Sequence, residues 1–374
     1  MSWQRFIKFT GIFLILAFST SSMFLSFLVR EIDGDDQPQL KSTLAFTSSF
    51  EDQFYDYRMK KTLDQKAAFP NIILGKVDDE SLKVIGRWPW KRETWAKVLN
   101  KLKGYGAKTI AFDVIFSEPE LVCGLRSGDD ALKESIIDFQ SIPGNKIILA
   151  YSNLTYFNES EAYKELPEDL YNFILDTKQE EGFNLKQYWV QSTTYPIKKL
   201  LETEAGLGYI SNQSDSDGVF RYYPLVNNID SLYFPSIGLL SFTSHTGAEV
   251  KLEIAANGNS VFKVNNHPIH LNINGEAKIR WMGDEQNFPA VSLHRILNAP
   301  ANDPELTKTL KGRMIFIGST AVGAHDLRNT PINPKLPGVY SHMNMANMLE
   351  KANFYKPSDD SLTKSLVILS IGLL

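Results

Sequence analysis

An uncharged stretch near the N-terminus constrains this chain more than any other feature of its sequence. Residues Phe9–Val29 carry no charged side chain, and a helix needs about 20 apolar residues to cross the hydrocarbon core of a bilayer. Arg5 and Lys8 precede the stretch, and positive flanks stay in the cytoplasm. We therefore expect a retained transmembrane helix with the following residues exported. The alternative is a cleaved signal peptide, whose apolar core is ordinarily shorter.

A second apolar run closes the sequence. Ser365–Leu374 (SLVILSIGLL) carries no charge and is about half as long as a bilayer-spanning helix. We interpret it as the start of a second transmembrane helix. The expected organisation is then a cytoplasmic N-terminus and transmembrane helix in residues 1–30, an exported domain in residues 31–360, and the second membrane segment in residues 361–374.

The amino-acid composition excludes some functions and some kinds of metal or disulfide site. The chain holds 39 Lys and Arg against 43 Asp and Glu, a net charge of −4 at neutral pH, which argues against a basic nucleic-acid-binding surface. Hydrophobic residues make up 43% of the chain, enough for an ordinary folded core. Cys123 is the only cysteine, so a disulfide framework and any zinc site that needs two thiolates are excluded.

Four apolar runs predict the strands of a parallel sheet. Helical patterns lie between them, and this alternation indicates parallel strands with helices on the faces of the sheet. The predicted strands are residues 71–77, 108–116, 146–151 and 313–318, and the predicted helices are residues 91–105, 129–139 and 339–350. The fold class is α/β, a mainly parallel sheet flanked by helices, between two transmembrane helices.

Two further segments complete the expected domain. An amphipathic helix is predicted over residues 42–61, with Phe54 and Tyr57 among the side chains of its apolar face. An antiparallel extension of the sheet is predicted from short runs separated by turn dipeptides such as Asp217-Gly218, which tolerate positive φ. Its runs are residues 208–211, 219–224, 260–264, 269–273 and 278–282.

Short motifs occur along the chain in an order that resembles the type-two CHASE domain, a cyclase- and histidine-kinase-associated sensory extracellular domain. The motifs are Asp56-Tyr57-Arg58, residues 77–82 (VDDESL), residues 86–92 (GRWPWKR), residues 106–116 (GAKTIAFDVIF), residues 217–224 (DGVFRYYP), Phe288-Pro289, residues 317–321 (IGSTA) with Asp326, Thr330-Pro331 and residues 337–342 (PGVYSH). Each motif is weak alone, but the ordered set covers most of the exported segment.

The resemblance implies an extracytoplasmic sensor that regulates a cytoplasmic nucleotide cyclase, diguanylate cyclase or histidine kinase. No such output module is visible in the sequence, so we expect no enzyme activity from this segment. The implied location is the inner membrane, with the main domain in the periplasm or outside the cell. The expected partners are an unknown small-molecule or protein signal, the membrane and a second copy in a homodimer. No cofactor and no nucleic acid are expected.

Both ends of the expected domain lead into membrane helices. A ligand that binds one arrangement better would shift the helix at residues 42–61 against the helix that enters the membrane near residue 361. This mechanism requires the two helix ends to be linked by packing, rather than to lie at opposite poles of the fold.

Two aspartates are the leading candidates for a ligand site. Asp78 and Asp113 each follow an apolar run, and ligands of open α/β sheets bind beyond the carboxyl ends of parallel strands. Carboxylates there can bind a cation or ligand hydroxyls, or act as acid and base. The structural alternative is that each caps a helix or pairs with an arginine such as Arg92. An exported hydrolase or transferase that uses both aspartates, and a purely structural dimerisation domain, stay open.

The turn after the last predicted strand adds further candidates. Its sequence, GSTAVG, resembles a phosphate-binding turn without the P-loop lysine, so Ser319 and Thr320 are ligand candidates beside the simpler interpretation of a capped tight turn. His325, Asp326 and His342 fall in one strand–loop–helix unit, where hydrogen bonding within the loop is the simpler interpretation and a metal or pH-sensing site is the alternative. The speculative ligand set is Asp78, Arg92, Asp113, Ser319, Thr320 and Asp326.

Three remaining motifs have structural interpretations. Trp88-Pro89-Trp90 is more typical of packing than of ligand stacking. Asp217-Gly218 with Arg221 indicates a hairpin turn with a paired strand charge. His267 and His270 flank a proline in a predicted hairpin and need not converge on a metal.

Overall fold

The computed structural model describes residues 52–354, apart from residues 65, 67–68, 121–126, 156–166, 181–184, 186–189, 230, 255–259 and 325. Tyr55–Tyr355 form one compact unit. The predicted membrane segments at Phe9–Val29 and Ser365–Leu374 lie outside the described residues, as do Cys123 and His325. Among the residues that are described, none of the helices has the length and apolar character needed to cross a bilayer.

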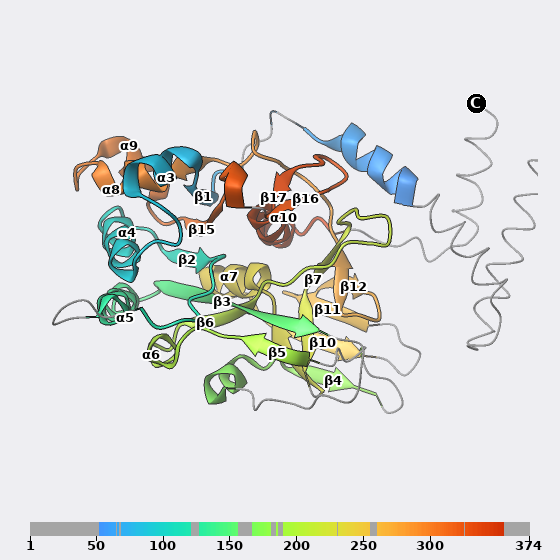
Figure 1. Ribbon diagram of the computed structural model, residues 1–374. Coiled ribbons are helices and arrows are strands. Elements are labelled where there is room, and N and C mark those ends of the chain that lie inside the picture. Colours follow the sequence, from blue (N-terminus) through green and yellow to red (C-terminus); the bar gives the residue numbers. More distant parts are fainter. Residues whose placement is uncertain are drawn as a thin grey trace, which may run out of the picture. The chain divides into compact units, whose positions relative to one another are not determined.

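The larger sheet has seven strands within the described residues, and six of them run parallel (Figure 1). Their order is β14 (Ala290–Ser292), β1 (Ile72–Val77), β15 (Met314–Ser319), β2 (Thr109–Phe112), β3 (Lys146–Thr155) and β6 (Gly206–Tyr209), while β5 (Val190–Thr194) pairs antiparallel with the end of β3. The predicted parallel sheet is confirmed. Phe112 lies beside Ile317 in the ladder, so the carboxyl ends of β2 and β15 meet at one edge.

The prediction of an antiparallel strand at residues 208–211 is wrong. β6 pairs parallel with β3 inside the large sheet. A Cβ at Gly208 would lie 2.6 Å from the Cα of Ile237, so glycine allows α7 (Ile237–Thr246) to pack directly on this strand. β6 has two glycines among its four residues, so the strand has little apolar signal of its own in the sequence.

Helices cover both faces of the large sheet. Alternate side chains of a strand point to opposite faces, so Ile315 and Phe316 of β15 belong to two different buried clusters. One face packs on α4 (Arg92–Gly104), α5 (Gly128–Gln140) and α8 (Leu293–Asn298), and the other packs on α7 and α10 (Val339–Glu350). The helices predicted at residues 91–105, 129–139 and 339–350 are therefore confirmed.

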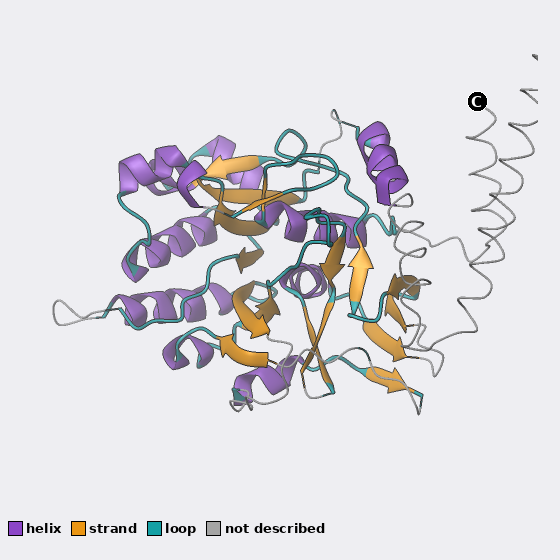
Figure 2. Cartoon of the chain, turned by 45° about the vertical axis from the view of Figure 1, so that its right-hand side comes forward, coloured by secondary structure: helices purple, strands orange, loops and turns teal. Residues whose placement is uncertain are grey.

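A smaller sheet forms the antiparallel part of the fold (Figure 2). Its strand order is β4 (Thr177–Gln179), β10 (Val250–Ile254), β11 (Ser260–Val264), β12 (His267–Leu271), β13 (Glu276–Lys278) and β7 (Tyr222–Pro224). All neighbours are antiparallel except β4 and β10. The strand predicted at residues 278–282 is wrong in its bounds, because the chain leaves the sheet after Lys278.

Short elements connect these layers. They are α3 (Asp79–Ile85), α6 (Lys198–Leu201), α9 (Pro304–Leu310), the hairpin β8 (Val226–Ile229) and β9 (Leu232–Pro235), the hairpin β16 (Leu327–Arg328) and β17 (Leu336–Pro337), and the 3-10 turns η1 (Glu168–Phe173) and η2 (Val322–Ala324). His267 and His270 are both exposed on β12, and their odd spacing puts them on opposite faces of that strand.

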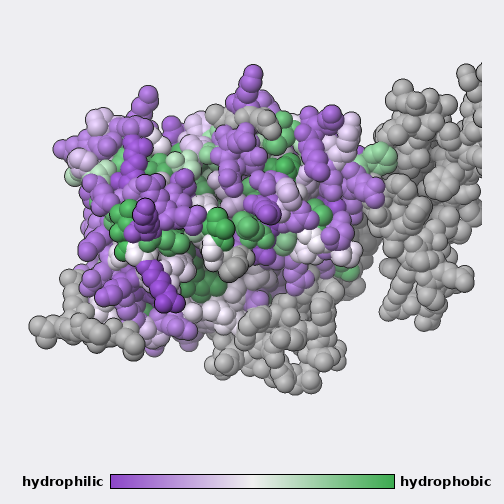
Figure 3. All heavy atoms as spheres, turned by 45° about the horizontal axis from the view of Figure 1, so that its top comes forward, coloured by the Kyte–Doolittle hydropathy of each residue, from purple (hydrophilic) through white to green (hydrophobic). Residues whose placement is uncertain are grey.

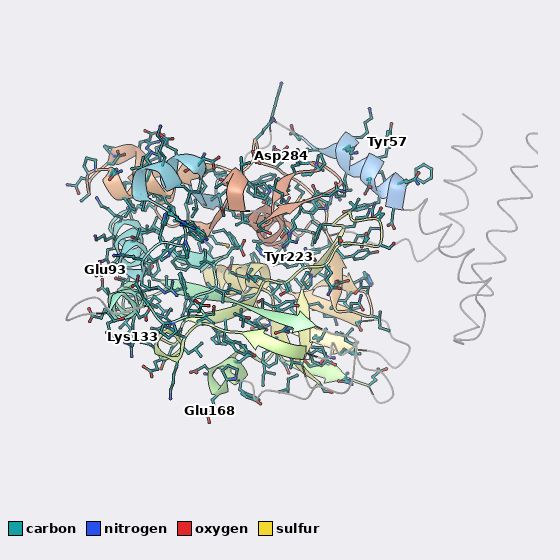
Figure 4. All side chains as sticks on the ribbon, viewed as in Figure 1. Tyr57, Glu93, Lys133, Glu168, Tyr223 and Asp284 are labelled. Carbon is teal, nitrogen blue, oxygen red and sulfur yellow. The ribbon has the colours of Figure 1, made fainter. Side chains whose placement is uncertain are left out.

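The first described helix covers residues 52–62 and agrees with part of the predicted helix at residues 42–61. Its apolar face differs from the prediction, because Tyr55 and Met59 are buried while Tyr57 is 59% exposed (Figure 4). Tyr55 and Met59 are four residues apart and so lie on one side of the helix. The Tyr55 hydroxyl donates to the carbonyl of Ile279, which joins this helix to the segment that follows β13.

α10 is enclosed along nearly its whole length. Every residue from Val339 to Leu349 is buried, because α7, β1, β15 and β17 all pack against the helix. The prediction placed Met343, Ala346 and Leu349 on one buried side, whereas the structure buries all sides. Asn344 and Asn347 are therefore polar residues inside a core. The stability of the domain depends on whether their side chains form hydrogen bonds.

Candidate functional site

Asp78 has a structural role at the start of α3. Its Oδ1 accepts hydrogen bonds from Ser81 N at 2.9 Å, Ser81 Oγ at 2.7 Å and Ser292 Oγ at 2.7 Å. Burial opposes the charged form of Asp78, but these hydrogen bonds outweigh it and lower its pKa to about 2. The carboxylate is thus the N-cap of α3 and a link to β14.

Replacing Asp78 with alanine is expected to lower the free energy of unfolding by about 1 kcal/mol, the usual cost of losing an N-cap. Because the pKa of Asp78 falls from 3.8 to about 2 on folding, its contribution is present above about pH 4 and is lost as the pH falls through about 2. Urea unfolding at pH 7 and at pH 3 measures the effect. Asp79→Ala is the control, since Asp79 lies in the first turn without capping it; equal losses in the two variants would contradict the capping role.

The guanidinium group of Arg92 is engaged by neighbouring residues of the domain. Its Nε lies 3.4 Å from Asp129 Oδ1, a terminal nitrogen donates to the carbonyl of Glu118 at 2.9 Å, and the guanidinium lies 4.8 Å from the ring centre of Phe116. Trp88, Trp90 and Trp95 pack in one aromatic cluster on the same face of the sheet. The packing interpretation of the Trp-Pro-Trp motif is confirmed.

In the glycine-containing turn after β15, the N–H groups of Thr320 and Ala321 are used in hydrogen bonds to the backbone of β1. The N–H groups of Thr320 and Ala321 donate to the carbonyl of Val77 at 3.0 and 3.2 Å, and Ser319 Oγ lies 3.4 Å from the same oxygen. A Cβ at Gly318 would lie 2.7 Å from the side chain of Val339, so this glycine allows α10 to approach β15. The turn ties β15 to β1 and seats α10.

A second polar group lies one strand away, where β2 ends. The side chain of Asp113 is 9% exposed, and no described residue donates a hydrogen bond to its carboxylate. The nearest cationic group is His342 of α10, whose Nε2 lies 3.7 Å from Asp113 Oδ1. β2 and α10 therefore present a carboxylate and an imidazole to each other inside the fold.

Tyr223 orients the imidazole of His342 from the opposite side. Its hydroxyl accepts from Gly238 N at 3.1 Å and lies 2.8 Å from His342 Nδ1 (Figure 4). Burial raises the pKa of Tyr223, so the hydroxyl keeps its proton, and we assign that proton to the bond with Nδ1. The remaining imidazole N–H is then on Nε2, which faces Asp113.

Asp326 completes this group at the solvent side. Its side chain is 38% exposed and pairs with Arg328 at 2.9 Å, and its backbone carbonyl accepts from Gly338 N at 2.9 Å beside the start of α10. Burial and the negative charge of Asp113 raise the pKa of Asp326, against the opposing effect of Arg328 and His342. We call Asp113, Tyr223, Asp326, Arg328 and His342 the edge site.

The structure brings together some of the predicted residues and separates others. Asp113 and Asp326 share the edge site. Asp78 faces Ser292 on the side of β14, and β15 lies between its strand and that of Asp113. The convergence of Asp78 and Asp113 that a hydrolase or transferase would need is therefore not present in the described residues. The predicted grouping of Asp326 with His342 is seen, whereas Tyr223 was missed because a lone buried tyrosine has no sequence signal.

α10 connects the edge site to the N-terminal helix through one segment, residues 279–284. Asn344 Oδ1 accepts from Met282 N and Gly283 N at 3.0 and 3.1 Å, and its Nδ2 donates to Gly283 O at 2.8 Å. The same segment accepts the hydrogen bond from Tyr55 of helix 52–62. α10 and helix 52–62 are thus joined by a shared partner. The helix expected near residue 361 lies outside the described residues, so the packing that the expected mechanism requires stays a prediction.

A buried arginine holds helix 52–62 at a second point. Arg221 is 2% exposed and binds Asp56 through two bonds of 2.8 Å, Asp215 at 2.8 Å and Asp217 at 2.7 Å. The predicted pairing of Arg221 with the turn at Asp217 is confirmed, but Arg221 precedes β7 instead of lying on a hairpin strand, and its bond to Asp56 was not foreseen. We call these four residues the Arg221 clamp.

Comparison with known proteins gives one match. The family described as CHASE2 domain matches residues 37–374, which is nearly the whole chain and includes both the edge site and the Arg221 clamp. No curated protein and no solved structure matches the chain.

Proposed function

The chain belongs to the CHASE2 domain family, a family of sensory, non-catalytic extracellular domains, and from that membership we propose that it is the input domain of a membrane-anchored receptor. The signal acts at the edge site, and the response leaves through α10 and helix 52–62. The single observation that carries the proposal is that His342 of the edge site belongs to α10, the last described helix before residues 355–374.

The proposed route follows from the contacts of α10. A change in the charge or hydrogen bonding of Asp113 alters the force on His342 3.7 Å away. Because α10 is enclosed and bound to residues 279–284 through Asn344, a displacement of the helix carries that segment with it. Tyr55 then transmits the displacement to helix 52–62. A ligand biases this route only by binding one arrangement better than the other.

The remaining parts of the receptor belong to the same proposal. Residues Phe9–Val29 anchor the domain in the inner membrane, the domain lies in the periplasm or outside the cell, and residues 361–374 begin the next membrane helix. A cytoplasmic nucleotide cyclase, diguanylate cyclase or histidine kinase receives the signal, and two copies act as a homodimer. The apolar segments at both ends of the sequence support this arrangement.

The test measures the distance between the two helices in the full chain in lipid nanodiscs. Spin labels replace Tyr57 and Lys351, which are both exposed, in a Cys123→Ser background. We expect Asp113→Asn to move or split the distance distribution by about 2–5 Å, the scale of helix shifts in signalling proteins. Asp138→Asn, on the outer side of α5 with a 54% exposed carboxylate, is the control. Unchanged distributions in both Asp113→Asn and His342→Gln would overturn the proposal.

A further inference from the structure

We propose that the edge site binds the ammonium group of a small primary amine that has an apolar body. This inference rests on the proposed function, because it names the class of signal that acts at the same site. The juxtaposition that carries it is a nearly buried carboxylate, Asp113, that accepts no hydrogen bond from any described residue, beside a second carboxylate that reaches solvent, Asp326.

The excess of negative charge in the edge site favours binding of a cation. Two carboxylates face one permanent cation, Arg328, and Arg328 lies on the outer side, where it pairs with Asp326 and stacks 5.1 Å from the ring centre of Phe220. Among the described residues, the other nitrogen base near Asp113 is His342, and its 3.7 Å separation is longer than a hydrogen bond. A carboxylate that is 9% exposed and accepts no hydrogen bond from a described residue gains most from a charged donor.

Geometry favours an ammonium group over a metal ion. Within the described residues no group of three His, Cys, Asp or Glu side chains is placed to bind a metal, and hard cations need six or more oxygen ligands. An ammonium group has three N–H donors on one small centre. The carboxylates of Asp113 and Asp326 provide acceptors for these donors.

The residues around the edge site indicate the chemistry of the ligand beyond its ammonium group. The loop that carries Asp326 exposes two large apolar side chains, Val322 at 76% and Leu327 at 44%. Figure 3 shows apolar and polar side chains interspersed over one face of the domain; Val322 and Leu327 are identified by their exposure. Exposed apolar side chains beside a charged site suit a ligand with an alkyl or aryl body, which a bare ammonium ion lacks.

The experiment compares three short-chain probes of different charge on the full chain in lipid nanodiscs. Isothermal titration at pH 7 and constant ionic strength measures n-butylamine, which is cationic, n-butanol, which is neutral, and butyrate, which is anionic. We expect heat of binding from n-butylamine alone. Asp326→Asn, at a half-exposed position that tolerates change, is expected to weaken binding about tenfold or more, as is Asp113→Asn, while Asp138→Asn leaves it unchanged.

Two results would overturn the amine proposal. One is binding of n-butanol or butyrate as strong as that of n-butylamine, and the other is n-butylamine binding that survives Asp326→Asn and Asp113→Asn. Absence of any n-butylamine binding counts equally against it. The spin-label distances keep this failure separate from that of the receptor proposal, because Asp113→Asn moves the labels whether or not an amine is the signal.

Discussion

Replacing Arg221 with methionine is expected to lower the free energy of unfolding by about 3 kcal/mol and to release helix 52–62. Removing one partner of a buried ion pair typically costs about 3–5 kcal/mol because the other charge is left without compensation. The lower end applies here, since Asp56 and Asp215 are 20% and 23% exposed and can be hydrated. Urea unfolding of the full chain in nanodiscs gives the stability, and hydrogen exchange at residues 55–62 reports the release.

Arg295→Met is the matched control for the clamp. Arg295 and Glu305 form an ion pair on the surface, with side chains 46% and 74% exposed, and such pairs contribute at most about 1 kcal/mol. A loss in Arg221→Met no larger than that in Arg295→Met, with protection of residues 55–62 retained, would show that the Arg221 clamp does not hold the helix.

Replacing Asn344 with leucine is expected to cost about 3 kcal/mol and to separate α10 from residues 279–284. Asn344 is fully buried and satisfies two backbone N–H groups and the carbonyl of Gly283. Leucine leaves these groups buried without partners, at about 1–3 kcal/mol for each one that water cannot reach. Chemical unfolding measures the loss of stability, and the distance between labels at residues 57 and 351 should broaden.

Asn347 offers a control on the same helix with the opposite expectation. It is 1% exposed, and within the described part of the chain its Oδ1 has no hydrogen-bond partner and its Nδ2 reaches the sulfur of Met282 at 4.0 Å. Asn347→Leu therefore removes little and is expected to change stability by less than about 1 kcal/mol in either direction. Similar losses at Asn344 and Asn347 would mean that packing volume, rather than hydrogen bonding, decides the cost.

The strands of the large sheet could be predicted because they carry their signal locally. In β1 and β15 nearly every side chain is buried, and strands covered on both faces are continuous apolar runs. The position of Asp113 after such a run also predicted its place at the carboxyl edge. β6 was misplaced because two of its four residues are glycines, and their role depends on α7, which the local sequence does not specify.

The partners of the polar residues could not be predicted, because they are distant in the sequence. Arg221 and Asp56 are 165 residues apart, and Tyr223 and His342 are 119 residues apart. A polar residue beside a strand or in a helix looks the same in the sequence whether it caps a turn, as Asp78 does, or faces an imidazole, as Asp113 does. Only the order of the strands and the packing of α10 separate these two aspartates.

The complete enclosure of α10 has a consequence for how a stimulus is read. A helix packed on every side cannot drift by small steps, since any partial movement opens gaps or creates overlaps in a close-packed interior. The helix either moves from one well-packed position to another or does not move. Each copy of the domain then behaves as a two-state switch, and the strength of a stimulus determines the fraction of copies that change state.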